Sequence, residues 1–358
     1  MRNYITEIPS FKTTLKKLVD APQDFTSEDL RLAFNCLFTP NLLSPEQVGV
    51  LLTAFHLHHV ERRPELLATA ASLLRERSLE VVVEGAEDFV VDIVGTGGDG
   101  HNLFNVSTTA GIVAAGAGAR VVKHGNKAST SSSGSADLLH ALGCRFPSRS
   151  NKDHLGTVSH IPFSFLLASH YHPTLQAIAP FRKAIPFRTI FNVLGPLISP
   201  AKPRGMVLGV PQQELGLPFA KALREGGVER ALVVCGQEGI DEISCAGPTW
   251  VWELRDGEIT PGVLSPDAFG LDAYPLEAVA GGSPDENAET LKTLLTSGGD
   301  IPSSKKPVLD FVLMNASALL VVAGLADSYT AGVKLAYDSV VSGNAWDALE
   351  TFRRELSK

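Results

Sequence analysis

The stretch Phe89-Val-Val-Asp-Ile-Val-Gly-Thr-Gly-Gly-Asp-Gly100 joins an apolar run to a glycine-rich loop, the pattern of a buried strand that leads into a helix. Gly95, Gly97 and Gly100 match the Gly-x-Gly-x-x-Gly fingerprint of dinucleotide-binding proteins. In those proteins an acidic residue about 20 positions further on, at the end of the second strand, binds the ribose hydroxyls. Here the second expected strand ends in Lys123-His-Gly-Asn-Lys127, which offers positive charge and no carboxylate. The loop is therefore interpreted as anion-binding, and a dinucleotide cofactor is not expected.

The chain around this loop alternates between strands and helices. Continuous apolar strands separated by helices are typical of a mainly parallel sheet with helices on both faces. A hairpin is expected at Trp250–Gly257, and Gly324 and Gly343 are expected to stop two of the closing helices. The expected strands cover 88–94, 119–122, 206–210 and 230–236, and the expected helices cover 107–117, 137–142, 212–224, 307–325, 329–342 and 344–356.

Residues 10 to about 80 contain helical patterns only. Ser44-Pro-Glu-Gln47 has the pattern of a capping box with proline at the first helical position, and Thr26-Ser-Glu-Asp29 opens an earlier helix in the same manner. A third helix is expected from Pro64 to Arg77. We therefore expect an α/β fold in two domains: a small helical domain over 1–85, joined by helices from about 170–200, and a larger α/β domain over 86–358.

The composition is that of an ordinary α/β protein with a large core. The 358 residues are 44% apolar and 20% charged, and the formal net charge is -8. An acidic chain is not expected to bind nucleic acid, which needs a basic surface, and without a run of about 18 apolar residues no membrane span is expected. The N-terminus lacks the apolar region of a signal peptide, and the four cysteines lack Cys-x-x-Cys spacing. A cytoplasmic protein with buried thiols is expected.

Three segments with anion-binding chemistry follow the expected strands. Gly95–Asp99 is a flexible loop whose amides can turn toward an anion, and Ser107 and Thr108 stand where the amides and hydroxyls of a helix start receive phosphate. Lys123–Lys127 adds positive charge, and Thr130–Ser135 is a hydroxyl-rich loop before another helix. Each segment alone could be an ordinary turn or helix cap. Because successive parallel strands end at one sheet edge, together they favour a ligand with phosphates at both ends.

Two further groups of residues carry charge that a substrate or metal could use. Asp241 and Glu242 are adjacent acids after the strand expected at 230–236. They suit Mg²⁺, which commonly binds a few carboxylates together with substrate phosphates; the alternative is a solvated turn with two exposed acids. His172-Pro173 starts a helix that carries Arg182. Arg182 or Arg188 could receive a substrate carboxylate through paired hydrogen bonds, or could tie a loop or cap a helix.

These motifs together resemble the anthranilate phosphoribosyltransferases, and the resemblance covers nearly the whole chain. In the family's order they are Gly95-Thr-Gly-Gly-Asp99, Asn105-Val-Ser-Thr108, Lys123-His-Gly-Asn126, Gly134-Ser-Ala-Asp137, His172-Pro173, Arg188-Thr-Ile-Phe-Asn192 and Asp241-Glu242. The resemblance implies Mg²⁺-dependent transfer of phosphoribose from 5-phosphoribosyl 1-diphosphate to the amine of anthranilate, the second step of tryptophan biosynthesis. It also implies a homodimer packed through the helical domains, with these two small molecules as substrates and no nucleic acid or membrane partner.

The resemblance also implies a role for each matching residue. Lys123, His124 and Arg182 are the implied catalytic residues. The phosphoribosyl donor would contact Gly95, Gly98, Asp99, Asn105, Ser107, Thr108, Lys123, Asn126, Lys127, Thr130, Ser131 and Ser135. Anthranilate would contact Gly95, His124, Asn126, His172 and Arg182, with Arg182 nearest its carboxylate. Ser107, Asp241 and Glu242 would coordinate Mg²⁺.

The chain departs from the family pattern at a few positions. Lys127 stands where arginine is usual, which replaces a bidentate grip on phosphate by a point charge. Leu103 stands where threonine or serine is usual and removes one hydroxyl contact with the donor, whereas Thr130 in place of serine keeps the hydroxyl. Ile185-Pro186 replaces Leu-Gly and alters the helix end near Arg182. No metal ligand or loop glycine is lost, so we expect an active enzyme with a shifted donor affinity.

Two other functions fit part of the pattern. A pyrimidine nucleoside phosphorylase of the same architecture would transfer ribose to phosphate and would not need paired acids for a metal. A non-catalytic relative would bind nucleic acid or a partner protein, which the net charge of -8 and the intact Asp241-Glu242 pair disfavour. A requirement for Mg²⁺ and for the diphosphate donor distinguishes the transferase from both.

Overall fold

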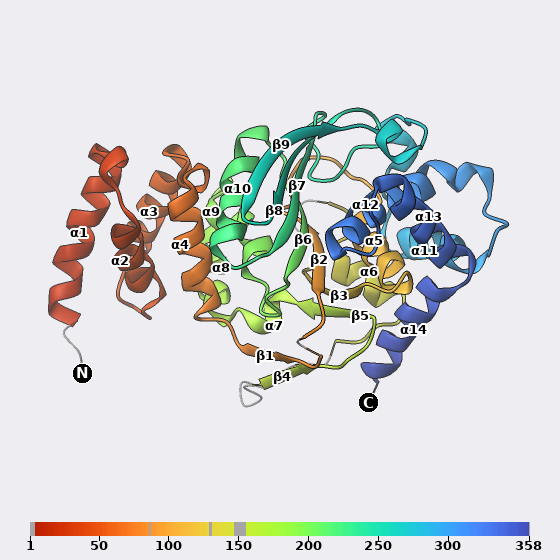
Figure 1. Cartoon of the computed structure of the whole chain (residues 1–358). Coiled ribbons are helices and arrows are strands. Elements are labelled where there is room, and N and C mark those ends of the chain that lie inside the picture. Colours follow the sequence, from red (N-terminus) through yellow and green to blue (C-terminus); the bar gives the residue numbers. More distant parts are fainter. Residues whose placement is uncertain (1–3, 86, 129–130, 147–154, 358) are drawn as a thin grey trace.

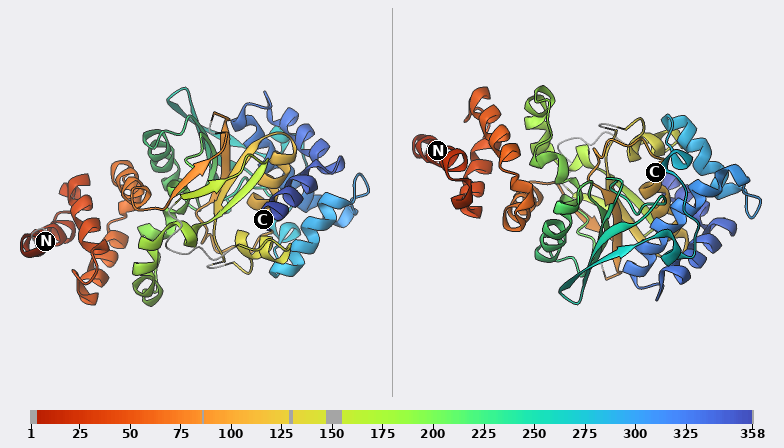
Figure 2. Two further views of the ribbon diagram at one scale, coloured as in Figure 1. Left: turned by 90° about the horizontal axis from the view of Figure 1, so that it is seen from below. Right: turned by 90° about the horizontal axis from the view of Figure 1, so that it is seen from above.

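A seven-stranded sheet runs through the larger part of the molecule, and a group of N-terminal helices extends from one side of it (Figures 1 and 2). The structure, a computed structural model, describes residues 4–85, 87–128, 131–146 and 155–357. The helical group and the sheet with its covering helices confirm the predicted α/β fold class.

The N-terminal part is helical, as predicted. It consists of α1 (Tyr4–Asp20), α2 (Ser27–Phe38), α3 (Pro45–Leu57) and α4 (Pro64–Arg75), with a 3-10 turn at Val60–Arg62. Both predicted capping boxes form: the side chain of Thr26 accepts a hydrogen bond from the Asp29 amide, and that of Ser44 accepts one from the Gln47 amide. α4 packs against α10 (Gln213–Glu225), a helix that itself lies on the sheet. α4 and α10 therefore connect the helical group to the rest of the molecule.

The central sheet has five parallel strands and an antiparallel edge, in the order β5-β3-β2-β6-β7-β8-β9. The parallel strands are β2 (Val90–Gly95), β3 (Arg120–Gly125), β5 (Phe163–Leu167), β6 (Gly205–Gly209) and β7 (Arg230–Gly236), and the edge hairpin is β8 (Thr249–Arg255) with β9 (Glu258–Leu264). The mainly parallel sheet and its late hairpin were predicted. β5 was not, nor was a separate two-stranded parallel sheet of β1 (Glu80–Val83) and β4 (Leu155–Val158).

The parallel strands of the sheet are buried on both faces, which explains their apolar sequences. Successive residues of a strand point to opposite faces. Leu232 and Val234 of β7 belong to the core under the C-terminal helices, whereas Val233 belongs to the core shared with α10 and the N-terminal helices. The second core also contains Phe191, whose ring stacks on Phe34 of α2 with centroids 5.3 Å apart. The segment around Phe191 therefore packs with the N-terminal helices rather than with the sheet alone.

Some of the remaining helices pack on the sheet and others pack on neighbouring helices. They are α5 (Val106–Gly116), α6 (Ser135–Ala141), α7 (Ala168–Tyr171), α8 (Pro173–Ala184), α9 (Ile190–Val193), α11 (Pro284–Thr296), α12 (Lys306–Ala323), α13 (Tyr329–Val341) and α14 (Asn344–Glu355). Gly324 and Gly343 follow α12 and α13 with φ of 76° and 83°, as the predicted helix stops. In the described part of the chain, only the segment Ser303–Ala323 is long and apolar enough to cross a membrane by length and composition. Of that segment's most apolar window 78% is buried, and α12 packs on β2, β6, β7 and α5, the position of a core helix.

Candidate active site

The candidate site lies at the carboxyl ends of the parallel strands, where the strand order reverses. From β2 the chain continues to β3 and β5 on one side, and then returns to β6 and β7 on the other. In open α/β sheets ligands bind in the crevice outside such a reversal point. A cavity of about 250 Å³ opens here, lined by the ends of β2 and β3, the loops that follow them and the turn after β7.

Most of the residues that the sequence analysis assigned to the donor and the metal line this one cavity. They are Gly95, Gly98, Asp99, Asn105, Ser107, Lys123, Asn126, Lys127, Ser131, Ser135, Asp241 and Glu242. Thr108 does not line it, because its side chain is fully buried in α5, and Thr130 lies outside the described residues. One prediction was wrong: Lys123–Gly125 are the end of β3, and Asn126, Lys127 and Ser131–Gly134 lie between β3 and α6, so the two segments follow one strand and not two successive strands. The third segment that lines the cavity is the turn after β7, which carries Asp241 and Glu242.

The glycine loop has a shape that only glycine adopts easily. Gly97 and Gly98 have φ of 72° and 73°, in the left-handed region. The Gly97 amide donates a hydrogen bond to Asp241 Oδ2 at 2.6 Å. A Cβ atom on Gly95 would lie 2.2 Å from the same oxygen, so no side chain fits there. The loop is therefore in direct contact with the first of the two adjacent acids.

Arg188 holds the same loop through its carbonyl oxygens. Its Nη1 donates to the Gly98 carbonyl at 2.8 Å and its Nη2 to the Gly97 carbonyl at 2.6 Å. The sequence analysis left open whether Arg188 receives a substrate carboxylate or ties a loop, and the structure shows that it ties the glycine loop. The sequence carries no signal for this contact, because the partners are main-chain carbonyls 90 and 91 positions upstream.

Hydrogen bonds between loops shape the second connection, β3 to α6. Asn105 Nδ2 donates to the Ser133 carbonyl at 2.7 Å, and Asn105 Oδ1 accepts from Asn287 Nδ2 at 2.9 Å. The Asp137 carboxylate accepts from the Ala128 amide at 2.7 Å. Asn105 is thus held between the β3–α6 connection and α11. Asn287 is a supporting residue that the sequence analysis did not single out.

Lys123 is a buried cation at the base of the cavity. Its side chain is almost inaccessible, and Nζ donates to the Ile93 carbonyl and, at 3.4 Å, to Ser107 Oγ. Burial lowers the pKa of Lys123, and the negative charges of Asp92 and Glu242 oppose that effect. Burial raises the pKa of Asp92 to about 6, an effect that the charge of Lys123 opposes. The positive charge of Lys123 is therefore enclosed among acids and directed at the start of α5.

Of the two adjacent acids, Asp241 is buried and Glu242 is partly buried. Burial raises the pKa of Asp241 to about 7, and the charge of Asp99 adds to the effect. Burial and the charge of Asp241 raise the pKa of Glu242 well above its ordinary value. Such a pair suits a divalent cation, and the Ser107 hydroxyl lines the same cavity. Among the described residues no group of three or more His, Cys, Asp or Glu could hold a metal, so a cation here would need additional oxygens such as phosphates.

The turn that carries the acids is held by the core helix α12. Asn315 is fully buried; its Oδ1 accepts from the Ile243 amide at 3.2 Å and its Nδ2 donates to the Ile243 carbonyl at 3.3 Å. On the opposite side, a Cβ atom on Gly209 would lie 1.6 Å from the Asp241 carbonyl oxygen. The turn is therefore confined between α12 and the end of β6.

His124 and His172 do not line the cavity but form a buried pair. His124 follows Lys123 on β3, so the two side chains point to opposite faces of the sheet. His124 Nδ1 lies 3.2 Å from the Gly195 carbonyl and must carry the proton of that hydrogen bond, so its Nε2 accepts from His172 Nε2 at 3.3 Å. Burial lowers the pKa of His124 to about 3 and that of His172 to about 4. Both imidazoles are therefore neutral near pH 7.

Arg182 lies in the last turn of α8, apart from the residues that line the cavity. Its Nε is buried and has no hydrogen-bond partner among the described residues, and burial lowers the pKa of its guanidinium. A guanidinium with an unused donor is suited to a carboxylate. The residues assigned to anthranilate are thus divided, because Gly95 and Asn126 line the cavity whereas His124, His172 and Arg182 do not.

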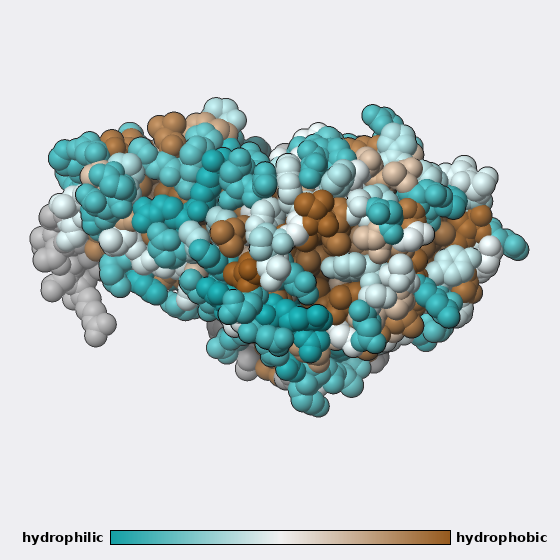
Figure 3. Space-filling view, turned by 45° about the horizontal axis from the view of Figure 1, so that its top comes forward, coloured by the Kyte–Doolittle hydropathy of each residue, from teal (hydrophilic) through white to brown (hydrophobic). Residues whose placement is uncertain are grey.

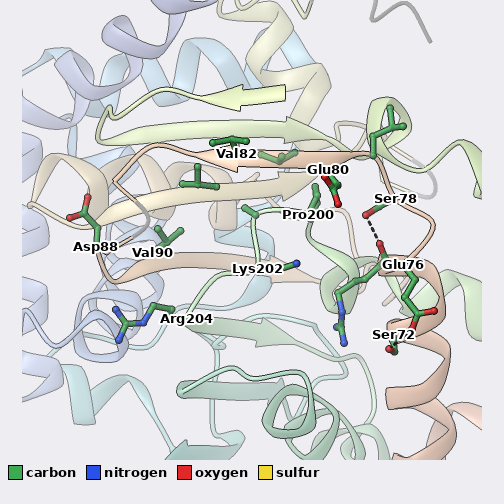
Figure 4. A pocket seen from close by; sticks show the side chains of 15 residues that line it. Ser72, Glu76, Ser78, Glu80, Val82, Asp88, Val90, Pro200, Lys202 and Arg204 are labelled. Carbon is green, nitrogen blue, oxygen red and sulfur yellow. Dashed lines mark hydrogen bonds between the residues drawn. The ribbon is translucent and has the colours of Figure 1, made fainter. Parts of the chain in front are cut away.

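Several larger hollows contain none of the residues assigned to a substrate or metal. One of about 640 Å³ lies between α4, β1 and the segment before β6, and its wall mixes acids such as Glu80 and Asp88 with cations such as Lys202 and Arg204 (Figure 4). Another of about 610 Å³ lies among the C-terminal helices. Figure 3 shows apolar patches on this part of the molecule and also over the N-terminal helices. By size alone these hollows would be the better candidates for a ligand-binding site. The anion-binding loops and the paired acids, however, line the smaller cavity.

Comparison with known proteins gives matches over most of the chain. The model of a glycosyl transferase family, its a/b domain, matches residues 87–346. An anthranilate phosphoribosyltransferase of Schizosaccharomyces pombe is 47% identical over 310 residues, which cover 86% of this chain and 87% of that protein. One of Deinococcus radiodurans is 42% identical over 317 residues, covering 88% of this chain and 91% of that protein.

Solved structures are similar over almost the whole chain. The anthranilate phosphoribosyltransferase of Saccharomyces cerevisiae in complex with PRPP (5-phosphoribosyl 1-diphosphate) and Mg is 34% identical with a TM-score of 0.87, and the match covers 98% of both chains. That of Thermus thermophilus is 36% identical with a TM-score of 0.84, covering 96% of this chain and 99% of that one. Another structure of the S. cerevisiae enzyme contains 4-fluoroanthranilate, with 32% identity, a TM-score of 0.85 and 98% of both chains covered.

Proposed function

Because the chain belongs to the anthranilate phosphoribosyltransferase family, we propose that it transfers the phosphoribosyl group of 5-phosphoribosyl 1-diphosphate to the amine of anthranilate. The products are N-(5-phosphoribosyl)anthranilate and diphosphate, and the reaction is the second step of tryptophan biosynthesis. The observation that carries this proposal is the convergence of a glycine loop, hydroxyls, Lys123 and two adjacent acids on one cavity at the strand reversal. A ligand with two phosphate-bearing ends and a divalent cation matches that chemistry.

The donor is proposed to occupy the cavity of about 250 Å³. The amides of the glycine loop and of the start of α5 would bind its phosphates, as helix N-termini and glycine-rich loops do in other folds. Lys127 would add a point charge rather than a bidentate grip. Leu103 also lines the cavity and offers no hydroxyl, so weaker donor binding than in relatives with threonine or serine is expected.

Asp241, Glu242 and Ser107 are proposed to hold Mg²⁺ together with oxygens of the donor's diphosphate. When bound, the ion would neutralise charge on the departing diphosphate. The carboxylates then need to be ionised, which the cation favours by opposing the burial that raises their pKa. The Asp241 carboxylate also accepts a hydrogen bond from the Gly97 amide, which links one proposed metal ligand directly to the phosphate-binding loop.

The reaction needs positioning more than proton transfer. The C1–O bond of the donor breaks, its electron pair leaves with diphosphate, and the anthranilate nitrogen forms a bond to C1. The aromatic amine is already neutral at pH 7, so no strong base is required before attack, and its proton passes to water afterwards. Lys123 and the loop amides stabilise the departing charge. His124, His172 and Arg182 are proposed to orient anthranilate, with Arg182 nearest its carboxylate.

The larger-scale assignments are also proposals. The helical domain is taken as residues 1–85 together with helices from about 170–200, which agrees with the shared core around Phe34 and Phe191. The α/β domain, 86–358, would bind the donor. We propose a homodimer packed through the helical domains, and a cytoplasmic location remains a prediction.

One assay tests the function. Anthranilate fluorescence should fall on addition of 5-phosphoribosyl 1-diphosphate and Mg²⁺, and should stay constant when either is omitted. A nucleoside phosphorylase would instead release base from a pyrimidine nucleoside and phosphate, and a non-catalytic relative would do neither. Constant anthranilate fluorescence with folded protein and both reagents present would refute the proposed function.

A further inference from the structure

We propose that Arg188 is a positioning residue that holds the glycine loop in its donor-binding shape, an inference that rests on the proposed function. The contact is specific: one guanidinium donates to two consecutive carbonyls, those of Gly97 and Gly98, at 2.6 and 2.8 Å. It is also tight, because a Cβ atom on Gly98 would lie 2.6 Å from Arg188 Cζ. Arg188 binds two residues that line the cavity but does not itself line it.

The hydrogen bonds around Arg188 form a continuous path to a proposed metal ligand. Arg188 binds the Gly97 carbonyl, and the amide of the same residue donates to Asp241 Oδ2. The loop is therefore held from both sides of one residue, by a cation on its carbonyl and a carboxylate on its amide. Gly97 and Gly98 have left-handed φ values. Because glycine can adopt many other backbone conformations, these contacts are needed to keep the loop in this one. Removing the Arg188 side chain would remove the hydrogen bonds to the two carbonyls and leave the loop held here by the Asp241 carboxylate.

The surroundings of Arg188 keep its charge in place. Burial lowers the pKa of its guanidinium, and the negative charges of Asp241, Asp99 and Glu61 oppose that effect. Glu61 lies in the 3-10 turn of the N-terminal helical group, whereas Asp99 and Asp241 belong to the site. A lysine would keep the charge, but its single ammonium does not reproduce the two parallel hydrogen bonds of a guanidinium.

Arg188 also stands between the two proposed substrate regions. It immediately precedes Thr189, the N-cap of α9, and follows the end of α8 that carries Arg182. The segment between α8 and α9, next to the residues that would orient anthranilate, therefore hydrogen-bonds to the glycine loop that would bind the donor. Because Arg188 hydrogen-bonds to the loop that would bind the donor, we expect its loss to weaken donor binding.

The test compares Arg188→Lys and Arg188→Ala with the unaltered protein. We expect the donor KM, measured with Mg²⁺, to rise about 10–100-fold in both, the range typical of supporting residues around a metal site. The anthranilate KM is expected to change less than threefold. Guanidinium chloride at low millimolar concentration should partly restore donor affinity to Arg188→Ala and not to Arg188→Lys, whose side chain still fills the space. Arg204→Lys is the matched control, because Arg204 forms a surface ion pair with Glu229 and does not line the site.

A second measurement does not depend on activity. Hydrogen exchange of the peptide spanning 95–103, followed by mass spectrometry without substrates, should be at least tenfold faster in both Arg188 variants and unchanged in the control. If the unaltered protein is inactive, the proposed function fails, yet this arm still tests whether Arg188 holds the loop. An active protein whose Arg188→Lys variant has an unchanged donor KM, or unchanged exchange over 95–103, would overturn the inference. Should Arg188→Ala not fold, Arg188→Lys and its exchange pattern decide alone.

Discussion

At the scale of single residues, the site contains charged groups that folding alone does not favour. Asp241 is buried beside Asp99, and burial followed by that charge raises its pKa from an ordinary 3.8 to about 7. The folded state therefore holds the Asp241 proton to higher pH than the unfolded chain does. Its contribution to stability is complete below about pH 4 and is lost as the pH rises through about 7. A bound cation would favour the ionised form of Asp241 and so oppose the effect of burial on its pKa.

Asp241→Asn should therefore separate stability from activity. Without metal, we expect the melting temperature at pH 8 to be about 3 °C or more above that of the unaltered protein, a shift of order one kcal/mol, and the difference to vanish near pH 4. Mg²⁺ with diphosphate should stabilise the unaltered protein only, and kcat/KM of the variant should fall about 10²–10³-fold, since a metal supplies several kcal/mol. Scanning calorimetry at both pH values and the fluorescence assay measure this. The expectation would be contradicted if the stability difference between the variant and the unaltered protein were less favourable to the variant at pH 8 than at pH 4.

The two histidines act in the opposite direction. Burial holds the folded pKa of His124 near 3 and of His172 near 4, below the ordinary 6.5. The unfolded chain therefore binds more protons between about pH 3 and 6.5, and the pair loses stability as the pH falls through that window. Near pH 7 this contribution is constant, so it does not disturb the comparison of Asp241 variants at pH 8.

Arg182→Ala tests the acceptor assignment. Loss of a hydrogen-bonded charge costs about 1.5–3 kcal/mol, so we expect the anthranilate KM to rise about 10–100-fold while the donor KM changes less than threefold. Lys183→Ala is the control, because Lys183 is the exposed neighbour on the same helix turn. Steady-state kinetics with each substrate varied in turn give both constants. Equal changes in the two KM values would reassign Arg182 to a structural role.

At the scale of elements, local patterns were enough where a segment's neighbours lie nearby in sequence. β2, β3, β6 and β7, the capped helices α2 and α3, and the three closing helices were predicted because each has a periodic apolar pattern with a recognisable start or stop. β5 was missed although four of the five residues of Phe163–Leu167 are apolar, close to the pattern used for the other strands. α11 was missed because its sequence is largely polar. The β1–β4 pair joins segments about 75 positions apart, a pairing that no local pattern specifies.

The candidate site divides in the same way. Most of the residues assigned to the donor and the metal do line the cavity, because their motifs sit at the ends of strands that could be recognised. The supporting contacts could not be predicted: Arg188 binds carbonyls of the glycine loop, and Asn287 binds Asn105 from 182 positions away. Main-chain partners leave no trace in side-chain identity. The burial of Lys123, and its hydrogen bond to a strand carbonyl, likewise depends on the assembled sheet.

Gly209→Ala tests the contact between the end of β6 and the acid turn. The new Cβ would overlap the Asp241 carbonyl, whose oxygen is 1.6 Å away, so the turn must move. We expect a stability loss of about 1–3 kcal/mol, as for other overpacked cores, and a fall in kcat/KM of at least about tenfold because the acids shift. Gly49→Ala in α3 is the control: nothing lies within 4 Å of its Cβ, and it should stabilise by roughly 0.5–1 kcal/mol. Chemical denaturation and the fluorescence assay measure both, and full activity in Gly209→Ala would mean that the turn tolerates displacement.

At the scale of the whole molecule, the N-terminal helices form one end of the structure (Figure 1). They share a hydrophobic core with α10 and with one face of the sheet, so they are not an independent appendage. Apolar side chains nevertheless remain exposed on α1 and α3, at Val19, Val50 and Leu57, with 47%, 49% and 63% of their surface accessible. These positions are where a second copy of the chain is expected to pack.

The proposed dimer gives a direct prediction. In sedimentation at micromolar concentration the protein should have about twice the chain mass of 38.1 kDa. Combined Val50→Glu and Leu57→Glu substitutions should shift it to a single chain, because two buried charges oppose association. Val263→Glu is the control, since Val263 is 58% exposed on β9, outside the helical group. A monomeric unaltered protein, or a dimer that only Val263→Glu disrupts, would refute packing through the helical domain.

The hold of Asn315 on Ile243 has a consequence for how the protein is made. Every residue assigned to a substrate or metal precedes position 243, yet the turn bearing the acids is anchored by a carboxamide more than seventy positions later. A nascent chain that has released all of its catalytic groups is therefore still incompetent until α12 leaves the ribosome and docks. Premature termination anywhere before that helix would yield a polypeptide with an intact set of active-site motifs and no ordered place to put them.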